Sequence, residues 1–185
     1  MSKQIMFWEK QQITGSEYLE LSYQNQTIQV ESTVLFLEND VPQRVLYRIF
    51  LNKNWVVKHL YIINHTLGKT LSLSTAGDGR WFNDDGDEIH MLNGALDVDI
   101  SCTPFTNSLP INRLKWTPDE PKLFEMVYIS TQDLSIKKVR QMYTLKNCHE
   151  NKRTFHYRSG TFESPVTVDK DGFVLEYPEL FKRKF

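Results

Sequence analysis

Cysteine is scarce in this sequence, which has only Cys102 and Cys148 among its 185 residues. Two cysteines without a CxxC pair exclude a disulfide framework and give no sign of a thiol-based redox or zinc site. The five histidines show no HExxH or similar ligand spacing, so we expect no metal and no other cofactor. A GxSxG motif is also missing, which removes the usual mark of a serine hydrolase.

Long apolar runs are absent as well. No stretch approaches the roughly 20 residues that span a membrane, and residues 1–12 lack the apolar core of a secretory signal. We therefore expect a cytoplasmic protein without stable membrane insertion. The formal net charge is only −1, so the chain as a whole does not attract nucleic acid, and we expect no nucleic-acid partner. The sequence carries no signal for an oligomeric state.

Apolar residues nowhere keep a 3.6-residue period for three turns, which argues against long amphipathic helices. Alternating and β-branched runs predict strands instead, for example at 17–23, 44–51, 55–63 and 122–131. The polar residues 52–54 predict a hairpin turn between two of these runs.

No linker, repeat or low-complexity segment divides the chain, so residues 1–185 are expected to form a single domain. Many strands in one small domain must protect their edges by rolling up or closing. The predicted fold is therefore all-β, an antiparallel roll or an open or half-closed barrel of many meandering strands, with at most a short helix. The mouth of such a sheet is a common ligand site.

Two aspartates, Asp97 and Asp99, alternate with aliphatic residues in the run LDVDI at 96–100. Alternate residues of a strand point to the same face of the sheet. The two carboxylates therefore share a face and lie roughly 6.5–7 Å apart. One interpretation is a half-buried strand that shows its polar face to water. The other is an acid–base pair, because this separation falls in the roughly 6.5–9.5 Å range of inverting glycosidases.

The residues that follow are polar and rich in turn signals. Pro104 cannot continue a strand ladder, Thr106 and Asn107 can bond nearby backbone, and an extended run is expected from Leu109 to Leu114. These polar groups either satisfy backbone that has left the sheet or form a rim suited to a sugar or polar head group. In the second interpretation Arg113, within the same run, would contact an anion.

The segments DGRWFNDDGDEI at 78–89 and LNGALDVDISCTPFTNSLPINRL at 92–114 resemble the signature of a bacterial family described as putative glycolipid-binding proteins. The tail GFVLEYPELF at 172–181 also matches, so the resemblance spans nearly the whole chain. The sequence departs from the family pattern at Ala95, where a cysteine is usual, and at Asn112, where an arginine is usual. An anion contact by that arginine would be weaker here or would fall to Arg113.

The resemblance implies a single β-roll similar to bacterial lipoprotein-carrier folds, and it offers no agreed catalytic residues. We therefore expect the protein to hold an elongated lipid or glycolipid-like molecule non-covalently in the concave face of the sheet. The aromatic residues would line an apolar cavity or fill the core, and Arg140 would contribute to the site or pair with one of the aspartates. The predicted ligand-binding residues are Asp97, Asp99, Thr103, Thr106, Asn107, Arg113, Trp81, Arg140 and Tyr143.

Two other functions fit the same residues. A hydrolase using Asp97 and Asp99 as acid and base requires one aspartate with a raised pKa facing a pocket. A protein-interaction module requires a packed core without a cavity and a large exposed apolar patch. We expect a binding protein rather than an enzyme.

Overall fold

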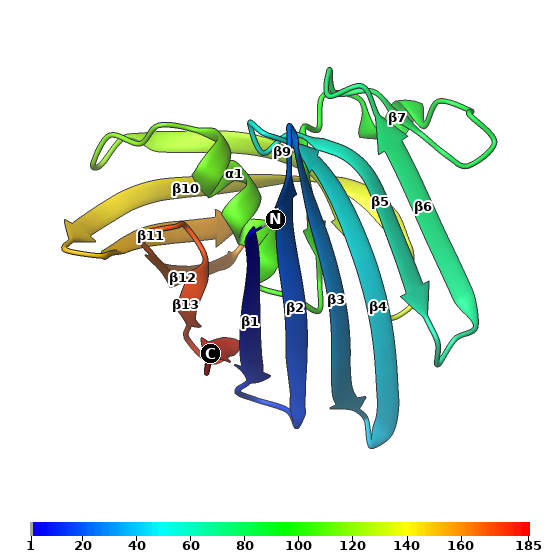
Figure 1. Cartoon of the computed structure of the whole chain (residues 1–185), viewed down its shortest axis with the longest axis horizontal. Helices are drawn as coiled ribbons and strands as arrows, with labels where there is room; N and C mark the ends of the chain where they lie inside the picture. Colours follow the sequence, from blue (N-terminus) through cyan, green and yellow to red (C-terminus); the bar gives the residue numbers. More distant parts are fainter. Residues whose placement is uncertain (1) are drawn as a thin grey trace.

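The computed structural model describes residues 2–185, which form one sheet of 14 strands with three short helical segments (Figure 1). The strands are β1 (Ser2–Lys10), β2 (Gly15–Gln24), β3 (Thr27–Glu38), β4 (Val41–Asn52), β5 (Val57–Asn64), β6 (Lys69–Thr75), β7 (Trp81–Phe82), β8 (Asp97–Ile100), β9 (Pro121–Ile129), β10 (Ile136–His149), β11 (Lys152–Ser159), β12 (Phe162–Asp169), β13 (Val174–Tyr177) and β14 (Phe181–Arg183). The helical segments are η1 (His90–Leu92), η2 (Phe105–Asn107) and α1 (Ser108–Arg113). No helix within residues 2–185 has the length and apolar character needed to cross a membrane.

The sheet is open and strongly curved, which confirms the all-β prediction. Its order runs from β7 through β6, β5, β4, β3, β2, β1, β14, β13, β12, β11, β10 and β9 to β8, and only the last pair is parallel. The two edges are tied together without a ladder between them. Gly94 N–H donates to Gly79 O at 2.9 Å, and the indole N–H of Trp81 donates to Ala95 O at 2.8 Å.

The apolar residues whose alternation predicted the strands are the buried residues of those strands. In β2, Leu19 and Leu21 face the concave side and are fully buried. Tyr18, the residue before Leu19, faces the other side and is 42% exposed. The turn between β3 and β4 holds Asn39 and Asp40 at φ +50° and +62°. Two positive φ values make a type I′ turn, whose twist matches that of the flanking strands.

Trp55 was expected in a strand, but it lies in the turn before β5 with φ +64°. The side-chain oxygen of Asn52 accepts hydrogen bonds from Asn54 N at 2.9 Å and Val56 N at 3.1 Å, which closes the turn around it. The indole then packs against the ring of Phe105, with the ring centres 6.5 Å apart. Tertiary packing therefore overrides the strand preference of this residue.

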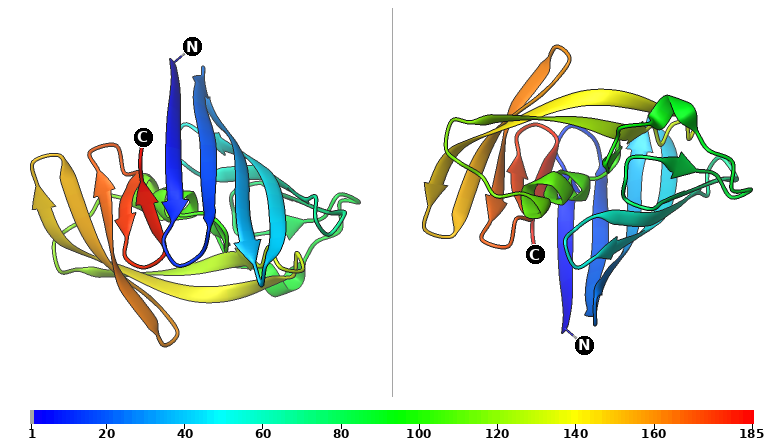
Figure 2. Two further views of the ribbon diagram at one scale, coloured as in Figure 1. Left: turned by 90° about the horizontal axis from the view of Figure 1, so that it is seen from below. Right: turned by 90° about the horizontal axis from the view of Figure 1, so that it is seen from above.

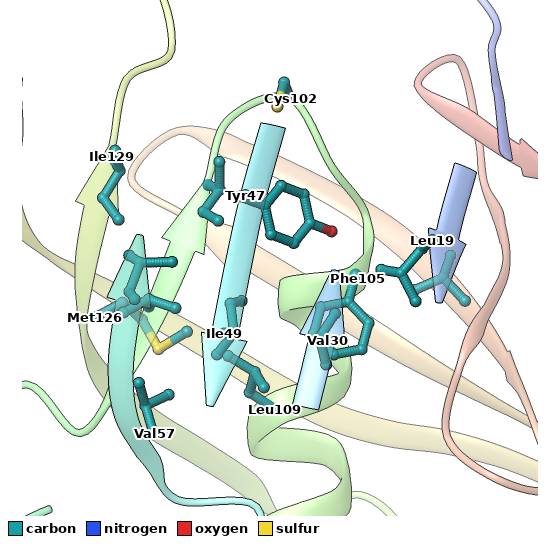
Figure 3. Close-up of a cluster of buried hydrophobic side chains, with 14 of the residues drawn as sticks. Leu19, Val30, Tyr47, Ile49, Val57, Cys102, Phe105, Leu109, Met126 and Ile129 are labelled. Atoms are coloured by element: carbon teal, nitrogen blue, oxygen red, sulfur yellow. The ribbon is translucent and has the colours of Figure 1, made fainter. Parts of the chain in front are cut away.

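The segment of η2 and α1 lies inside the curve of the sheet (Figures 1 and 2). We expected an extended run from Leu109, and this prediction is wrong because Pro110 falls in the first turn of α1. In that turn the missing N–H of proline costs no helical hydrogen bond. Phe105 and Leu109 are fully buried and face the strands across the core, where Figure 3 shows them with Leu19, Val30, Tyr47 and Ile49. The chain itself thus fills the centre of the concave face.

The end of α1 fits against a glycine in the turn between β12 and β13. Gly172 has φ +81°, and a Cβ at this position would overlap the side-chain amide of Asn112. We expect Gly172→Ala to lower the free energy of unfolding by about 3 kcal/mol, through backbone strain and overpacking together. Urea unfolding followed by tryptophan fluorescence measures the loss.

Gly160 supplies the matched control, because its φ is +59° and no atom of residues 2–185 lies near the position of an added Cβ. Gly160→Ala is expected to cost only about 1 kcal/mol, from backbone strain alone. Equal losses in the two variants would show that the contact with α1 does not matter.

Candidate functional site

The two aspartates of β8 point into the curve of the sheet, toward η2 and α1. Asp97 is fully buried and accepts two hydrogen bonds from Arg113 of α1, from Nε at 3.2 Å and from Nη2 at 2.5 Å. Burial raises the pKa of the Asp97 carboxyl, and the guanidinium opposes this shift. Asp97 and Arg113 therefore form a buried ion pair that fixes α1 on the sheet.

Asp99 is bound differently. Its Oδ2 accepts a hydrogen bond from Nε2 of Gln141 at 2.6 Å, and its Oδ1 accepts one from Oγ1 of Thr106 at 3.2 Å. Burial raises the pKa of this carboxyl, and among the described residues only these two hydrogen bonds, rather than a positive charge, oppose the shift. Unlike Asp97, Asp99 lines a cavity.

This cavity has a volume of about 370 Å³ and lies on the concave face of strands β8 to β14. Aromatic rings from five strands form its walls, and three polar side chains from β8 and the following segment lie beside them. We name it the tyrosine pocket and define it by Tyr128, Tyr157, Phe162, Tyr177 and Phe181 together with Asp99, Thr103 and Asn107.

A buried hydrogen-bond network holds the polar side of the pocket. Tyr143 Oη donates to Oδ1 of Asn107 at 2.8 Å, and Nδ2 of Asn107 donates to Pro104 O at 3.1 Å. Tyr143 and Gln141 are each 1% exposed and lie two positions apart on the inner face of β10. Because these partners are locked, Asn107 and Asp99 present fixed oxygen and nitrogen atoms to the pocket.

The rings of the pocket pack against one another at angles typical of aromatic pairs. The ring centres of Tyr157 and Tyr177 are 5.9 Å apart, and those of Tyr157 and Phe162 are 6.1 Å apart. Burial raises the pKa of both tyrosines, and the nearby Asp99 carboxyl adds to the shift. Their phenols therefore stay protonated and neutral at physiological pH.

Lys137 is the cation at the edge of this pocket, where its Nζ lies 5.2 Å from the ring centre of Tyr128. It is exposed, whereas Asp99 is not. The interior of the pocket thus combines apolar ring faces with hydroxyl, amide and carboxyl groups. Such a surface is complementary to an uncharged, hydroxylated molecule with apolar faces.

The predicted site residues fall into three groups. Asp99, Thr103 and Asn107 line the pocket, and Thr106 and Tyr143 hold these residues from behind. Asp97 and Arg113 form the structural ion pair described above.

Trp81 and Arg140 do not line the pocket. Trp81 is buried in β7, where its indole N–H is bound to Ala95 O. Arg140 is exposed on the outer face of β10, where its Nη2 lies 3.1 Å from Oε1 of Glu125. The alternative in which Arg140 pairs with Asp97 or Asp99 is therefore wrong, because Arg140 and these aspartates lie on opposite faces of the sheet.

An aromatic lining was one of the two expectations from the sequence, but the individual tyrosines and phenylalanines of these walls were not predicted. Tyr128, Tyr157 and Tyr177 occupy inward positions of three separate strands, as their alternation with outward residues indicates. That alternation was readable in advance. The order of the strands in the sheet, which brings the three rings together, was not.

Comparison with known proteins shows the family to which the chain belongs. The model of a family described as "Putative glycolipid-binding" matches residues 5–183. The chain belongs to this family. The family membership that the sequence resemblance indicated is thereby confirmed.

Among solved structures, the chain is similar to a DUF1089 family protein from Pseudomonas aeruginosa. The two share 28% sequence identity over 90% of this chain and 91% of the other, with a TM-score of 0.78. A search of the curated proteins found no match.

Proposed function

We propose that the protein binds a lipid or glycolipid-like molecule non-covalently, with the hydroxylated head group of that molecule in the tyrosine pocket. The observation that carries the proposal is the pocket itself, in which aromatic rings face Asp99, Thr103 and Asn107. Ring faces suit the apolar faces of a sugar, and the polar side chains suit its hydroxyls. The description of the family supports the same class of ligand.

The size of the pocket sets how such a ligand would lie. A volume of about 370 Å³ is near the lower end of the roughly 300–1,000 Å³ of small-molecule sites. It suits a head group rather than a whole lipid, because η2 and α1 already fill the centre of the concave face. The apolar tail would leave past Phe162, which is 45% exposed at the rim.

A hydrolase using Asp97 and Asp99 together has less support. Asp99 does face a pocket, and the pKa of its carboxyl is raised, as that function requires. Asp97 is bound on two sides of its carboxylate by Arg113 and does not line the pocket. The two carboxylates therefore have no common space in which to act on one bond.

Titration calorimetry with n-octyl β-D-glucopyranoside, below its critical micelle concentration, tests the proposal. We expect Asp99→Asn to weaken binding about tenfold, because a charged acceptor for ligand hydroxyls becomes a neutral one. Affinity of the unaltered protein should also fall as the pH is lowered. The ionised carboxylate is the form of Asp99 that accepts these hydrogen bonds. Because the pKa of Asp99 is raised, the affinity should already fall at a pH above 3.8, the ordinary pKa of aspartate.

Arg140→Gln provides the control, since Arg140 is exposed on the outer face of the same sheet. Its affinity should equal that of the unaltered protein, and the affinity of Asp99→Asn should change less with pH in the acid range than that of the unaltered protein. Equal affinity in all three proteins, with the same pH dependence, would place the ligand elsewhere.

A further inference from the structure

A second group of polar side chains lies on the concave face next to the tyrosine pocket. Glu17 in β2 is 1% exposed, and its Oε1 accepts hydrogen bonds from Ser32 Oγ at 2.7 Å and Tyr47 Oη at 2.5 Å. Tyr47 Oη also lies 3.1 Å from Oγ1 of Thr103, which lines the pocket. Thr103 thus connects the pocket to the buried carboxyl through hydrogen-bonded groups.

The other oxygen of Glu17 is not satisfied. Within residues 2–185, Oε2 is buried and has no hydrogen-bond partner. Burial without a donor is unfavourable for a carboxyl oxygen, and native proteins rarely leave such an atom unpaired. A donor that reached Oε2 would therefore satisfy this atom.

Lys10 supplies a complementary charge beside this position. Trp8 pairs with Glu17 across β1 and β2, and Lys10 is the next residue of β1 on the same face. Lys10 and Glu17 are therefore diagonal neighbours, within reach of long side chains. In the described part of the chain the ammonium has no ion pair; its Nζ lies 4.5 Å from the ring centre of Phe181 and 4.8 Å from that of Phe36.

The two rings belong to two different cavities. Phe181 lines the tyrosine pocket, while Phe36 and Lys10 line a larger, more open cavity of about 990 Å³ beside the turn between β1 and β2. Burial lowers the pKa of Lys10, and the Glu17 carboxyl opposes this shift. A charged group thus stands unpaired at the boundary between the two cavities.

We propose that Lys10 and Glu17 form a second polar subsite, which binds a hydroxyl group of the ligand held in the tyrosine pocket. The hydroxyl donates to Oε2 of Glu17 and accepts from the ammonium of Lys10. An alcohol offers this combination, whereas a pure donor or a pure acceptor does not. The inference rests on the proposed function and narrows its ligand class to head groups with hydroxyls on two sides, as in a sugar ring.

Two probes with the same tail test the subsite by calorimetry. The first, n-octyl β-D-glucopyranoside, carries several hydroxyls, and the second, 2-octyloxyethanol, carries one. We expect Lys10→Met and Glu17→Gln each to weaken binding of the glucoside about tenfold. The double variant should lose little more than either single one, because one hydroxyl contacts both residues. Binding of 2-octyloxyethanol should not change.

Two further measurements keep the result interpretable. Lys182→Met removes the same charge from an exposed position on β14, the strand next to β1, and should leave both affinities unchanged. The ¹³C resonance of the Glu17 carboxyl, followed in the unaltered protein, should shift as the glucoside binds. This readout does not depend on the folding of any variant.

The outcomes separate this inference from the proposed function. The subsite is overturned if Lys10→Met and Glu17→Gln bind the glucoside normally and the Glu17 resonance stays silent, while Asp99→Asn still weakens binding. Equal losses for both probes would also overturn it, since they would indicate a general structural defect. Failure of the unaltered protein to bind either probe would remove both proposals.

Discussion

Replacing Arg113 with methionine is expected to lower the free energy of unfolding by about 3–5 kcal/mol. The substitution leaves the fully buried Asp97 carboxyl without its two hydrogen bonds from the guanidinium. A buried charge without a partner is far more costly than an exposed one. The Asp97 carboxyl must then either stay ionised in an apolar environment or take up a proton. Urea unfolding at neutral pH measures the loss.

Two control variants show whether the loss comes from the buried charge. The double variant Asp97→Asn/Arg113→Met removes both charges and should recover most of the stability. Lys146→Met breaks an exposed pair with Asp119, at 2.8 Å, and should change stability by less than about 1 kcal/mol. A loss of that small size in Arg113→Met would contradict the structural role assigned to the ion pair.

The largest expected effect on binding comes from filling the tyrosine pocket. Ser159 lies on the inward face of β11, next to Tyr157 in the alternation, and lines the pocket. Ser159→Trp places an indole in a cavity of about 370 Å³ and is expected to weaken binding of n-octyl β-D-glucopyranoside more than a hundredfold, over about 2.7 kcal/mol. Calorimetry with the same probe measures the change.

Arg158→Trp is the matched control for this experiment. Arg158 is adjacent in the chain and exposed on the opposite face of the same strand. The same indole there should leave affinity unchanged. Comparable losses in both variants would mean that β11 tolerates no tryptophan, and a normal affinity in Ser159→Trp would place the ligand outside the pocket.

The fold class was predictable because burial alternates along the strands, as Leu19 and Leu21 illustrate in β2. The inner helix was not predictable from periodicity. At six residues, α1 is too short to show a 3.6-residue period, and Leu109-Pro110 reads locally as extended chain. Only packing of the segment inside the sheet selects the helix.

The polar side of the pocket was predictable and the aromatic side was not, for a physical reason. Asp99, Thr103 and Asn107 are close together in the chain, so turn chemistry alone groups them. Tyr128 and Tyr177 come from strands that are distant in sequence, and only the order of the sheet brings them together. The same holds for Glu17, whose alternation indicates an inward position but not the partners it meets there.

The central claim is that the tyrosine pocket holds the ligand. Native mass spectrometry of the protein purified gently from its host, beside Ser159→Trp prepared in the same way, tests it most directly. The account predicts an adduct of lipid or glycolipid mass on the unaltered protein, released on denaturation and missing from the variant. A clean mass for the unaltered protein, unchanged after incubation with mixed lipids, would contradict it.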